Sequence, residues 1–207
     1  MISNDYFDAT APISAGPVAL LLLAAGASTR MGQPKQLLPY HGRTLLRHAA
    51  ETAANSGCIP RVLVTGALHA ELLLEVAGLE FSVVRNEDWA TGMGSSIAVG
   101  LAELEAHHPN LAAVVVMLCD QPLLTPEVLQ QLKQQFFSTG QPVVATAYAG
   151  IRGVPALFGR TVFAELRNLN GAGGARELLQ RYAHLPTVAF AGGALDVDTA
   201  AQYAALP

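Results

Sequence analysis

The sequence predicts an α/β fold, a three-layer structure in which helices flank a mainly parallel, Rossmann-like sheet. Strand-like apolar segments alternate with segments of helical periodicity along most of the chain. One strand-like segment, Ala112–Leu118, is almost continuously apolar and rich in valine, which is typical of a central strand buried on both faces. Glycine-containing loops follow several of these segments, at the strand ends where open α/β sheets bind ligands.

Length and composition limit the class of protein. The chain has 207 residues, which is the length of one domain with enough residues for a sizeable core. About half of the residues are hydrophobic (51%) and 14% are charged, so we expect a compact globular protein rather than a disordered one. The net charge of −4 at pH 7 argues against a broad nucleic-acid-binding surface, although a single nucleotide needs only local positive charge.

The beginning of the chain and the cysteines bear on where the protein works. Residues 1–17 contain acidic residues and prolines but no basic residue, unlike a secretory signal. We therefore expect a frayed tail there, followed by a single domain over residues 18–207. The longest apolar run is far too short to cross a membrane. Cys58 and Cys119 cannot form a disulfide framework, which favours a reducing, cytoplasmic compartment.

The expected elements alternate in type along the chain. Six segments predict strands, namely Val18–Ala24, Arg61–Thr65, Phe81–Arg85, Ala112–Leu118, Pro142–Ala147 and Thr187–Phe190. Helical patterns cover Thr44–Ala54, His69–Ala77, Thr161–Leu166 and Arg176–Arg181. Three more helices are expected behind capping residues, the first after Ser95 or Ser96, the second after Thr125 with Pro126 at its first position, and the third after Asp198 or Thr199.

The loop behind the first predicted strand has the composition of an anion-binding loop. Gly26 and Gly32 allow the backbone to approach a ligand closely. The spacing of these glycines matches neither a Walker A loop nor the dinucleotide fingerprint. Phosphate binding and an ordinary strand–turn–helix connection both remain open on this pattern alone. The polar side chains that favour phosphate binding are those of Ser28, Thr29, Arg30 and Lys35.

From Leu23 to Lys35 the sequence resembles, without a gap, the signature Leu-Ala-Ala-Gly-x-Ser-x-Arg-Met-Gly-x-x-Lys of the MobA/MocA-type nucleotidyltransferases. The resemblance implies a fold similar to the nucleotide-diphospho-sugar transferases, with the loop wrapped around the triphosphate of an NTP. It also implies that Arg30 and Lys35 neutralise the phosphates. The Leu-Ala-Ala-Gly version of the loop, with Ala25, is more similar to the cytidylyl members than to the guanylyl members, so CTP is the favoured nucleotide.

A second motif lies behind the third predicted strand. The stretch from Asn86 to Ser96 matches the family segment Asn-x-x-Trp-x-x-Gly-Met-x-x-Ser, which lies against the base and ribose in the family. Taken without the resemblance, the stretch favours a capped helix start over an anion-binding site. The resemblance implies nucleotide contacts from Leu23, Ala24, Ala25, Gly26, Ser28, Arg30, Met31, Gly32, Lys35, Thr65, Gly66, Asn86, Gly92, Met93, Ser95 and Ser96.

Two carboxylates are candidates for a metal site. Asp120 follows the central strand, where a carboxylate can either hold Mg²⁺ or cap a turn. Similarity to the family motif Gly-Asp-x-Pro favours the metal. Asp196 matches the first aspartate of the family's Asp-Ile-Asp-Thr motif and is implied to be the second carboxylate on the ion. Asp198 or Thr199 is expected only to cap the last helix.

The sequence departs from the family pattern at three positions. Cys119 stands where glycine is usual, and we interpret it as a small buried residue. Val154 replaces the histidine of a Gly-His-Pro motif, and Ala172 replaces an acidic residue before Gly-Ala-Arg. The loop over residues 170–176 is either a mobile substrate flap or a simple turn. The residues that the resemblance assigns to the acceptor are Pro155, Gly174 and Arg176.

The resemblance extends from Val18 to Tyr203, with the motifs in the family's order. It implies that CMP is transferred from CTP to the terminal phosphate of molybdopterin or molybdenum cofactor, with Mg²⁺ as the cofactor and pyrophosphate as the leaving group. The catalytic groups would be Arg30, Lys35 and Asp120. One alternative is a transferase that uses GTP or another phosphorylated acceptor, such as a sugar or alcohol phosphate. Another is a non-catalytic nucleotide or cofactor carrier that docks on a molybdoenzyme or its chaperone.

Overall fold

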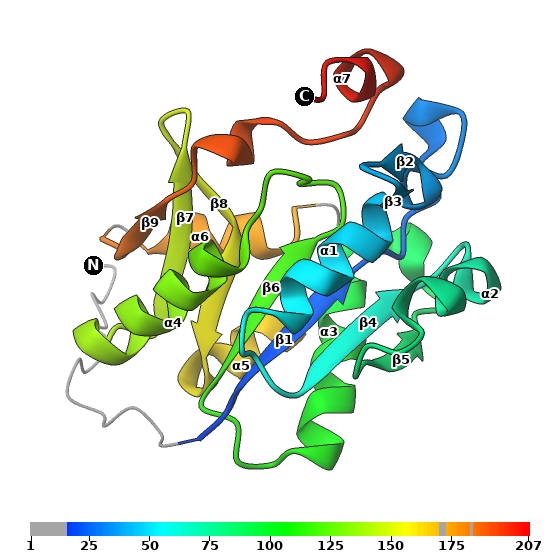
Figure 1. Ribbon diagram of the computed structural model, residues 1–207. Coiled ribbons are helices and arrows are strands. Elements are labelled where there is room, and N and C mark those ends of the chain that lie inside the picture. Colours follow the sequence, from blue (N-terminus) through cyan, green and yellow to red (C-terminus); the bar gives the residue numbers. More distant parts are fainter. Residues whose placement is uncertain (1–15, 170–172, 183) are drawn as a thin grey trace.

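A computed structural model describes residues 16–169, 173–182 and 184–207 as a three-layer α/β domain (Figure 1). Most of the expected tail, residues 1–15, lies outside the described residues. So do Asn170, Gly171 and Ala172, which belong to the expected substrate flap or turn. None of the described helices is long and apolar enough to cross a membrane.

The sheet has seven strands, and the predicted parallel core is at its centre. β1 (Val18–Leu23) pairs in parallel with β4 (Arg61–Thr65) on one side and with β6 (Ala113–Leu118) on the other. The spatial order is β5 (Ser82–Arg85), β4, β1, β6, β8 (Ile151–Gly159), β7 (Val143–Tyr148) and β9 (Thr187–Ala189). A small hairpin of β2 (Pro39–Tyr40) and β3 (Arg43–Thr44) follows the first loop.

All six predicted strands are present, with ends within one residue of the predicted ones, but β8 was not predicted. β8 pairs antiparallel with both β6 and β7, so the sheet is mixed at that side. The register between β7 and β8 shifts after Ala145, which leaves Val154 and Pro155 unpaired with β7. Proline lacks the N–H that a regular ladder needs, so a shift at this point accommodates it. The proline and the nearby glycines made this strand unrecognisable in the sequence.

Helices cover both faces of the sheet (Figure 1). One face is covered by α1 (Leu45–Ala54) and α4 (Pro126–Thr139), with the short α2 (His69–Leu72) at one end. The other face is covered by α3 (Met93–His107), α5 (Phe163–Arg167) and α6 (Ala175–Arg181). The C-terminal α7 (Ala200–Ala204) lies apart from these layers, beside the β2–β3 hairpin.

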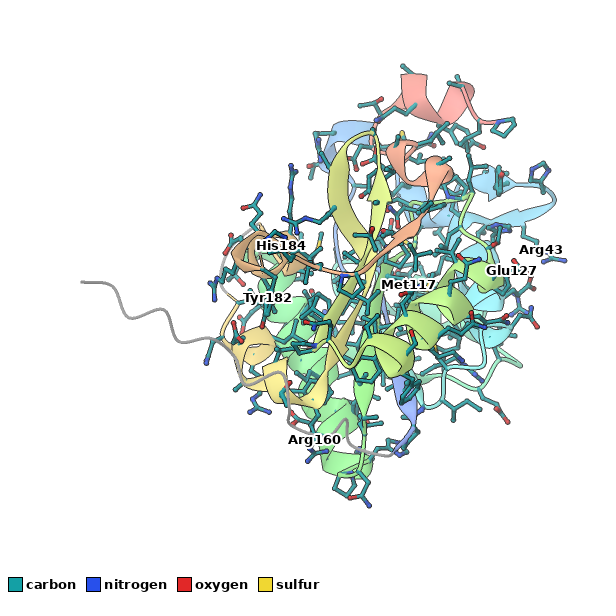
Figure 2. The ribbon with its side chains drawn as sticks, turned by 90° about the vertical axis from the view of Figure 1, so that its left-hand side faces the viewer. Arg43, Met117, Glu127, Arg160, Tyr182 and His184 are labelled. Atoms are coloured by element: carbon teal, nitrogen blue, oxygen red, sulfur yellow. The ribbon has the colours of Figure 1, made fainter. Side chains whose placement is uncertain are left out.

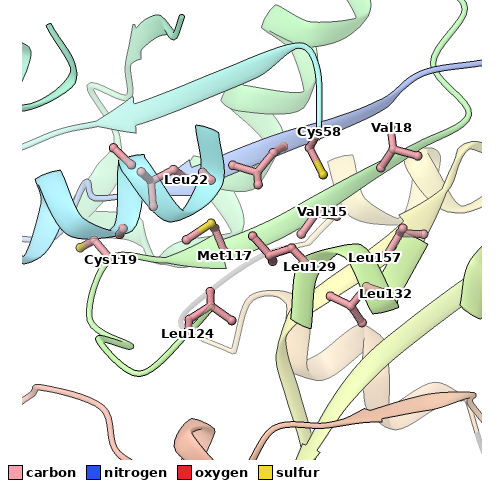
Figure 3. Packing of buried hydrophobic residues seen from close by; sticks show 14 of the residues in the cluster. Val18, Leu22, Cys58, Val115, Met117, Cys119, Leu124, Leu129, Leu132 and Leu157 are labelled. Atoms are coloured by element: carbon pink, nitrogen blue, oxygen red, sulfur yellow. The ribbon is translucent and has the colours of Figure 1, made fainter. Parts of the chain in front are cut away.

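Alternation along β1 explains why the sheet has a core on each face. Leu20 and Leu22 belong to the cluster under α1 and α4, part of which is drawn in Figure 3, whereas Leu21 and Leu23 belong to the cluster under α3. The Leu20, Leu21 and Leu22 side chains are fully buried, as expected for a central strand. In Figure 2 charged side chains such as Arg43 and Glu127 point outward, while Met117 of β6 lies in the interior.

Two of the predicted helix caps are confirmed and one is wrong. Thr199 caps α7 by accepting a hydrogen bond from the Gln202 amide. Thr125 is at the N-cap position of α4 with Pro126 directly after it, although the Thr125 side chain makes no capping hydrogen bond. However, α3 begins at Met93, so Ser95 and Ser96 lie inside its first turn rather than before it. Their hydroxyls instead accept hydrogen bonds from the Asn86 side chain, which ties the first turn of α3 to the segment after β5.

Candidate active site

A single buried side chain, that of Gln36, holds the loop after β1 in shape. Its Nε2 donates hydrogen bonds to the carbonyl oxygens of Gly26 at 2.6 Å and Ala24 at 3.2 Å. Its Oε1 accepts from the hydroxyl of Ser28, which itself accepts from the backbone amide of Lys35. Ser28 has a positive φ of 55°, a conformation that needs such support in a residue other than glycine. The loop is therefore preorganised and keeps Lys35 at its end.

The two cations of this loop meet two carboxylates from distant parts of the chain. Lys35 Nζ lies 2.6 Å from Asp120 Oδ2 and 2.7 Å from Asp198 Oδ1. Arg30 Nη2 lies 3.0 Å from Asp198 Oδ2. The Lys35 and Asp120 side chains are only 18% and 10% exposed, whereas that of Arg30 is 74% exposed. The loop after β1, the end of β6 and the segment before α7 thus converge on one point.

The charges around Lys35 fix its protonation state. Burial on its own lowers the pKa of Lys35, but Asp120 and Asp198 outweigh that effect and raise the pKa above the ordinary value. Burial raises the pKa of Asp120, as do the charges of Asp198 and Asp196, while Lys35 opposes the change. Burial also acts against ionised Asp198, but hydrogen bonds and charges from Lys35 and Arg30 lower its pKa overall. Lys35 is therefore a permanent cation at this point.

One oxygen of Asp120 is available for a ligand. Asp120 Oδ1 is buried and has no hydrogen-bond partner within the described ranges. Asp196 lies near enough for its charge to affect Asp120, and one of its own oxygens accepts a hydrogen bond from Gln202 at 3.3 Å. Mg²⁺ prefers carboxylate oxygens and shares its coordination with water and substrate phosphates. An unpartnered buried oxygen beside a second carboxylate fits such an ion.

These carboxylates do not enclose a metal ion by themselves. In the part of the chain that the structure describes, no three histidine, cysteine or acidic side chains gather as a metal-binding group. An ion at Asp120 would therefore take most of its ligands from water and from a bound nucleotide, as Mg²⁺ does in phosphoryl-transfer sites.

Two adjoining clefts border this charged cluster. The larger, of about 320 Å³, runs from the loop after β1 to the start of α3, and the smaller, of about 240 Å³, lies on the loop itself. The smaller cleft is lined by Gly26, Ala27, Ser28, Thr29, Arg30, Lys35 and Asp198. The larger is lined by Leu23, Ala24, Ala25, Gly26, Lys35, Gln36, Trp89, Ala90, Gly92, Met93, Ser96, Leu118, Cys119 and Asp120.

Four of the residues assigned to the nucleotide support the larger cleft without lining it. The backbone amide of Asn86 donates to the Thr65 carbonyl at 2.8 Å, and its side chain donates to Ser95 and Ser96. Gly66 packs so closely beneath Trp89 that an added Cβ would lie 2.8 Å from that side chain. Thr65, Gly66, Asn86 and Ser95 therefore position the wall, and of the two serines only Ser96 reaches the cleft.

Two further residues of the first motif face elsewhere. Met31 packs into a cluster with Leu38, Tyr40, Leu45 and Val197, where it joins the loop to the C-terminal segment. Gly32 ends the short helical turn of Thr29–Met31 in a left-handed conformation, with φ at 72°. Neither residue lines one of the two clefts, so their position indicates a part in shaping the loop.

The three residues assigned to the acceptor lie in different parts of the structure. Pro155 is in β8, two residues after Gly153, and Arg176 is exposed near the start of α6. Gly174 precedes α6 with φ at 50°, and a Cβ there would lie 3.0 Å from Met93, a residue of the larger cleft. Gly174 thus adjoins the cleft directly.

Cys119 is buried, as expected from the sequence. Burial is the main cause that raises the pKa of its thiol to about 12, and the charge of Asp120 acts in the same direction.

Three residues of the site were missed from the sequence or given another role. Nothing in the sequence indicated the role of Gln36, because a glutamine that hydrogen-bonds to the backbone of its own loop cannot be distinguished in the sequence from one exposed to solvent. Trp89 was part of the quoted motif but was not assigned to the nucleotide, although it is the only tryptophan of the chain and lines the larger cleft. Asp198 was interpreted as a cap, yet its carboxylate is paired with two cations.

A family profile matches most of this chain. The profile of the MobA-like NTP transferase domain matches residues 20–186, which include the loop, the strand β6 with Asp120, and β8. The chain belongs to the MobA-like NTP transferase family. This membership agrees with the resemblance drawn from the first motif, and places the protein among the nucleotidyltransferases.

Relatives of this MobA-like chain carry several names. Purine catabolism protein PucB of Bacillus subtilis is 30% identical over 169 residues, which cover 77% of this chain and 79% of PucB. Nicotine blue oxidoreductase of Paenarthrobacter nicotinovorans is 46% identical over 114 residues, or 54% of this chain and 53% of that protein. The matched stretch thus spans about half the length of that relative, and about a quarter of the length of several bifunctional GlmU proteins.

A solved structure supports the fold along almost the entire MobA-like chain. The crystal structure of Rv0371c from Mycobacterium tuberculosis has a TM-score of 0.79 and 33% sequence identity, and the match covers 92% of this chain and 97% of that one. A second structure of Rv0371c was solved in complex with manganese, at 31% identity and with a TM-score of 0.74. The mainly parallel, helix-flanked sheet predicted from the sequence is therefore confirmed.

Proposed function

We propose that this protein transfers CMP from CTP to the terminal phosphate of molybdopterin or molybdenum cofactor, with Mg²⁺ as its cofactor and pyrophosphate as the second product. The observation that carries the proposal is the position of Lys35, a permanent cation that lines both clefts. It pairs with one oxygen of the Asp120 carboxylate, while the other oxygen has no hydrogen-bond partner among the described residues. A triphosphate needs positive charge and a metal-binding carboxylate side by side.

The proposed roles follow from charge and distance. The terminal phosphate of the acceptor attacks the α-phosphorus of CTP, and the bond from that phosphorus to the β-phosphate oxygen breaks. Both reactants are anionic, so the chain must offset their repulsion. Arg30 and Lys35 draw charge from the β- and γ-phosphates as pyrophosphate leaves. Mg²⁺ bound by Asp120 and Asp196 would supply further positive charge at the phosphoryl oxygens.

The remaining residues bind and orient rather than react. The loop around Gly26 is held open by Gln36, so its backbone can approach the phosphates without reorganising. Trp89, Ala90 and Met93 give the far end of the larger cleft an apolar wall for the base and ribose. In-line positioning carries the rate, and we expect no nucleophilic side chain and no covalent intermediate.

The choice of CTP rests on Ala25. This residue gives the loop the Leu-Ala-Ala-Gly sequence that is similar to the cytidylyl members of the family. Its carbonyl oxygen lies close under Gly66, since a Cβ on that glycine would be 2.5 Å away, so the wall of the cleft is tightly packed at this point.

Release of pyrophosphate tests the proposal. The purified protein would be incubated with Mg²⁺, CTP or GTP, and molybdopterin or molybdenum cofactor. We expect release with CTP, and we expect Asp120→Ala to abolish it while the fold is kept. Glu127→Ala is the matched control, because Glu127 is an exposed carboxylate in the first turn of α4. A near-normal rate in Asp120→Ala would remove Asp120 from the proposed mechanism.

The other outcomes of that assay select between the alternatives. Nucleotide binding without release would favour a non-catalytic carrier. Release only with GTP, or only with a sugar or alcohol phosphate, would assign the same phosphate loop to a different substrate pair. Other acceptors are included in the assay because Val154 and Ala172 differ from the family pattern in the region assigned to the acceptor.

The similarity to nicotine blue oxidoreductase favours a second candidate function. In that case the cleft would hold a two-electron reductant of nicotine blue, and a reduced nicotinamide dinucleotide serves as the probe because it shares a base, a ribose and phosphate groups with an NTP. Adding nicotine blue and reduced dinucleotide to the same preparation tests this candidate. A change in the absorbance of both compounds, with no pyrophosphate formed from CTP, would support the oxidoreductase over the transferase.

A further inference from the structure

Gln121, the residue after Asp120, has a buried polar atom that nothing described satisfies. Its Nε2 donates to the carbonyl oxygen of Val154 in β8 at 3.0 Å, which anchors the side chain to the neighbouring strand. Its Oε1 is buried and lacks a hydrogen-bond partner in the described part of the chain. The residue as a whole is only 5% exposed. An unsatisfied buried acceptor costs free energy, so this oxygen is suited to accept a hydrogen bond from a ligand.

Tyr148, at the end of β7, brings a hydroxyl group to the same corner. Its hydroxyl oxygen lies against Gly153, where an added Cβ would be 2.2 Å away. Its ring lies against Gly193, where an added Cβ would be 2.4 Å from the Cδ1 atom of Tyr148. The ring also meets Phe190 edge to face, with centroids 6.1 Å apart. Two glycines and an aromatic neighbour therefore fix the phenol in place, and no larger residue fits at Gly153 while it is there.

This corner adjoins the catalytic carboxylates. The amide of Val197 donates to the carbonyl oxygen of Asp120 at 2.9 Å, so the C-terminal segment that starts beside Tyr148 passes directly over Asp120. Figure 1 shows this segment leading from β9 past the β7–β8 hairpin and across the end of the sheet toward α7. The charges of Asp196, Arg176 and Asp120 and the side chain of Gln121 all act on the pKa of the Tyr148 phenol, so these groups lie near its hydroxyl.

The phenol of Tyr148 remains protonated at neutral pH. Burial is the main reason that its pKa is raised, and the charges of Asp196 and Asp120 act in the same direction. Arg176 and Gln121 oppose the shift without reversing it. Tyr148 is thus a hydrogen-bond donor, whereas the free oxygen of Gln121 is an acceptor. The pair presents one donor and one acceptor, side by side, next to Asp120.

We propose that Tyr148 and Gln121 bind the acceptor substrate and select one that offers a neighbouring C=O and N–H, as a cyclic amide of a heterocycle does. Tyr148 donates to the carbonyl oxygen of that ring, and Gln121 Oε1 accepts from its N–H. A sugar phosphate lacks this planar edge and would leave the buried oxygen unsatisfied. The inference rests on the proposed transfer to a phosphorylated acceptor. It adds that the site recognises the acceptor by the C=O and N–H of a cyclic amide.

Tyr148→Phe is the central test because it keeps the packed ring and removes only the hydroxyl. With CTP and the phosphorylated acceptor, we expect the KM of the acceptor to rise about 3- to 10-fold, the effect of one lost hydrogen bond, while the KM of CTP stays unchanged. Tyr182→Phe is the matched control, since Tyr182 also donates its hydroxyl to a side chain, that of Glu165, at the far end of α6. A change confined to CTP, or equal changes in both variants, would overturn the proposal.

Binding of a simple pterin, which carries the cyclic amide but no phosphate, tests the inference apart from catalysis. We expect the wild-type protein to quench pterin fluorescence on binding, and Tyr148→Phe and Gln121→Met to weaken that binding. A pterin methylated at the amide nitrogen has no N–H, so its binding should be insensitive to Gln121→Met. Equal binding of both pterins to the wild type and to Tyr148→Phe would overturn the inference.

The two assays separate the failure of this inference from that of the proposed function. If no acceptor supports pyrophosphate release but pterin binding depends on Tyr148, the transfer reaction is wrong and the ring-binding site stands. If release occurs and Tyr148→Phe changes neither the acceptor KM nor pterin binding, the transfer stands and the assignment of Tyr148 and Gln121 is wrong. Should Gln121→Met fail to fold after losing its bond to Val154, Tyr148→Phe alone decides.

Discussion

Asp198 places its carboxylate 2.7 Å from the ammonium group of Lys35, a residue 163 positions earlier in the chain. The other oxygen of the same carboxylate contacts Arg30. Both cations of the loop are thus engaged by one acidic residue of the C-terminal segment. On the proposed function, an incoming triphosphate would compete with Asp198 for these two cations, so we expect the carboxylate to weaken anion binding by the loop.

Asp198→Asn should therefore strengthen triphosphate binding when no divalent metal is present. Removing one negative charge frees Arg30 and Lys35 for the phosphates, and we expect CTP to bind about 5-fold more tightly, equivalent to about 1 kcal/mol. Isothermal titration calorimetry with CTP in the presence of EDTA measures this affinity. Glu127→Gln removes the same charge far from the loop and serves as the control. Unchanged or weaker binding in Asp198→Asn would show that the carboxylate does not compete.

Gln36→Leu should loosen the loop and weaken nucleotide binding. The substitution removes the donor to the Gly26 and Ala24 carbonyls, and we expect a loss of about 1–3 kcal/mol in the free energy of unfolding for these unsatisfied groups. The affinity for CTP should fall as the loop loses its preorganised shape. Denaturant unfolding and calorimetry measure the two effects.

Gln130→Leu is the matched control for this substitution. Gln130 also donates its side-chain amide to a backbone carbonyl, that of Asn55 at 3.4 Å, but it is exposed on α4. We expect little change in either the free energy of unfolding or CTP affinity. If Gln36→Leu behaved like Gln130→Leu, the bonds of Gln36 would have no part in holding the loop.

His48 gives the protein a pH-dependent stability. Burial lowers the pKa of His48, and its Nε2 lies 2.9 Å from the carbonyl oxygen of Pro122, in the loop that follows Asp120. Since the unfolded state protonates first as pH falls, the stabilising effect of the neutral ring is present above the unfolded pKa of about 6.5 and is lost below it. We expect the free energy of unfolding to fall between pH 7 and pH 5.

Replacement of His48 isolates this contribution. His48→Gln keeps a side-chain donor for the Pro122 carbonyl but cannot gain a charge in this range, so its loss of stability between pH 7 and pH 5 should be smaller than that of the wild type. Denaturant titrations at a series of pH values measure the difference, with the exposed His108→Gln as control. Identical pH profiles for His48→Gln and the wild type would assign the pH dependence to other groups.

The residues that sequence reasoning located correctly are those whose chemistry follows from local pattern. Val18–Leu23 and Ala113–Leu118 are recognisable because a strand buried on both faces must be apolar throughout. Lys35 stood out because it supplies positive charge to the glycine-containing loop after the first strand, and Asp120 because it follows the central strand, where open α/β sheets bind ligands. Their approach to 2.6 Å agrees with the expectation that both face one cleft.

What the sequence did not reveal depends on contacts between distant segments. Asp198 looks like a helix cap until the C-terminal segment is seen crossing the loop after β1, and the neighbouring Asp196 carried the motif instead. Gln121 became visible as a binding candidate only when Val154 was found to occupy its amide and leave its oxygen free. The assignment of Asp196 to the metal stays a prediction.

Gly66 should be intolerant of even one added methyl group, with a specific effect on the nucleotide. A Cβ at Gly66 would lie 2.5 Å from the carbonyl oxygen of Ala25 and 2.8 Å from Trp89, so Gly66→Ala must displace at least one of these two residues, both of which line the larger cleft. We expect CTP affinity to fall at least about 10-fold, the usual scale for losing about 1.4 kcal/mol of binding free energy. Gly100→Ala is the contrasting variant, because its Cβ would clash with Val64 and Leu21 in the core beneath α3.

The two variants separate a packing defect from a defect of the site. Both introduce a contact shorter than van der Waals distance, and overpacking of this kind costs about 1–3 kcal/mol of stability. Only Gly66→Ala crowds residues that line the larger cleft, Ala25 and Trp89, so at a temperature where both variants are folded, only this one should bind CTP more weakly. Differential scanning calorimetry and CTP titration on the same samples measure both quantities. If Gly100→Ala weakened CTP binding as much as Gly66→Ala, the loss would reflect general destabilisation, and the larger cleft would lose its support as the nucleotide site.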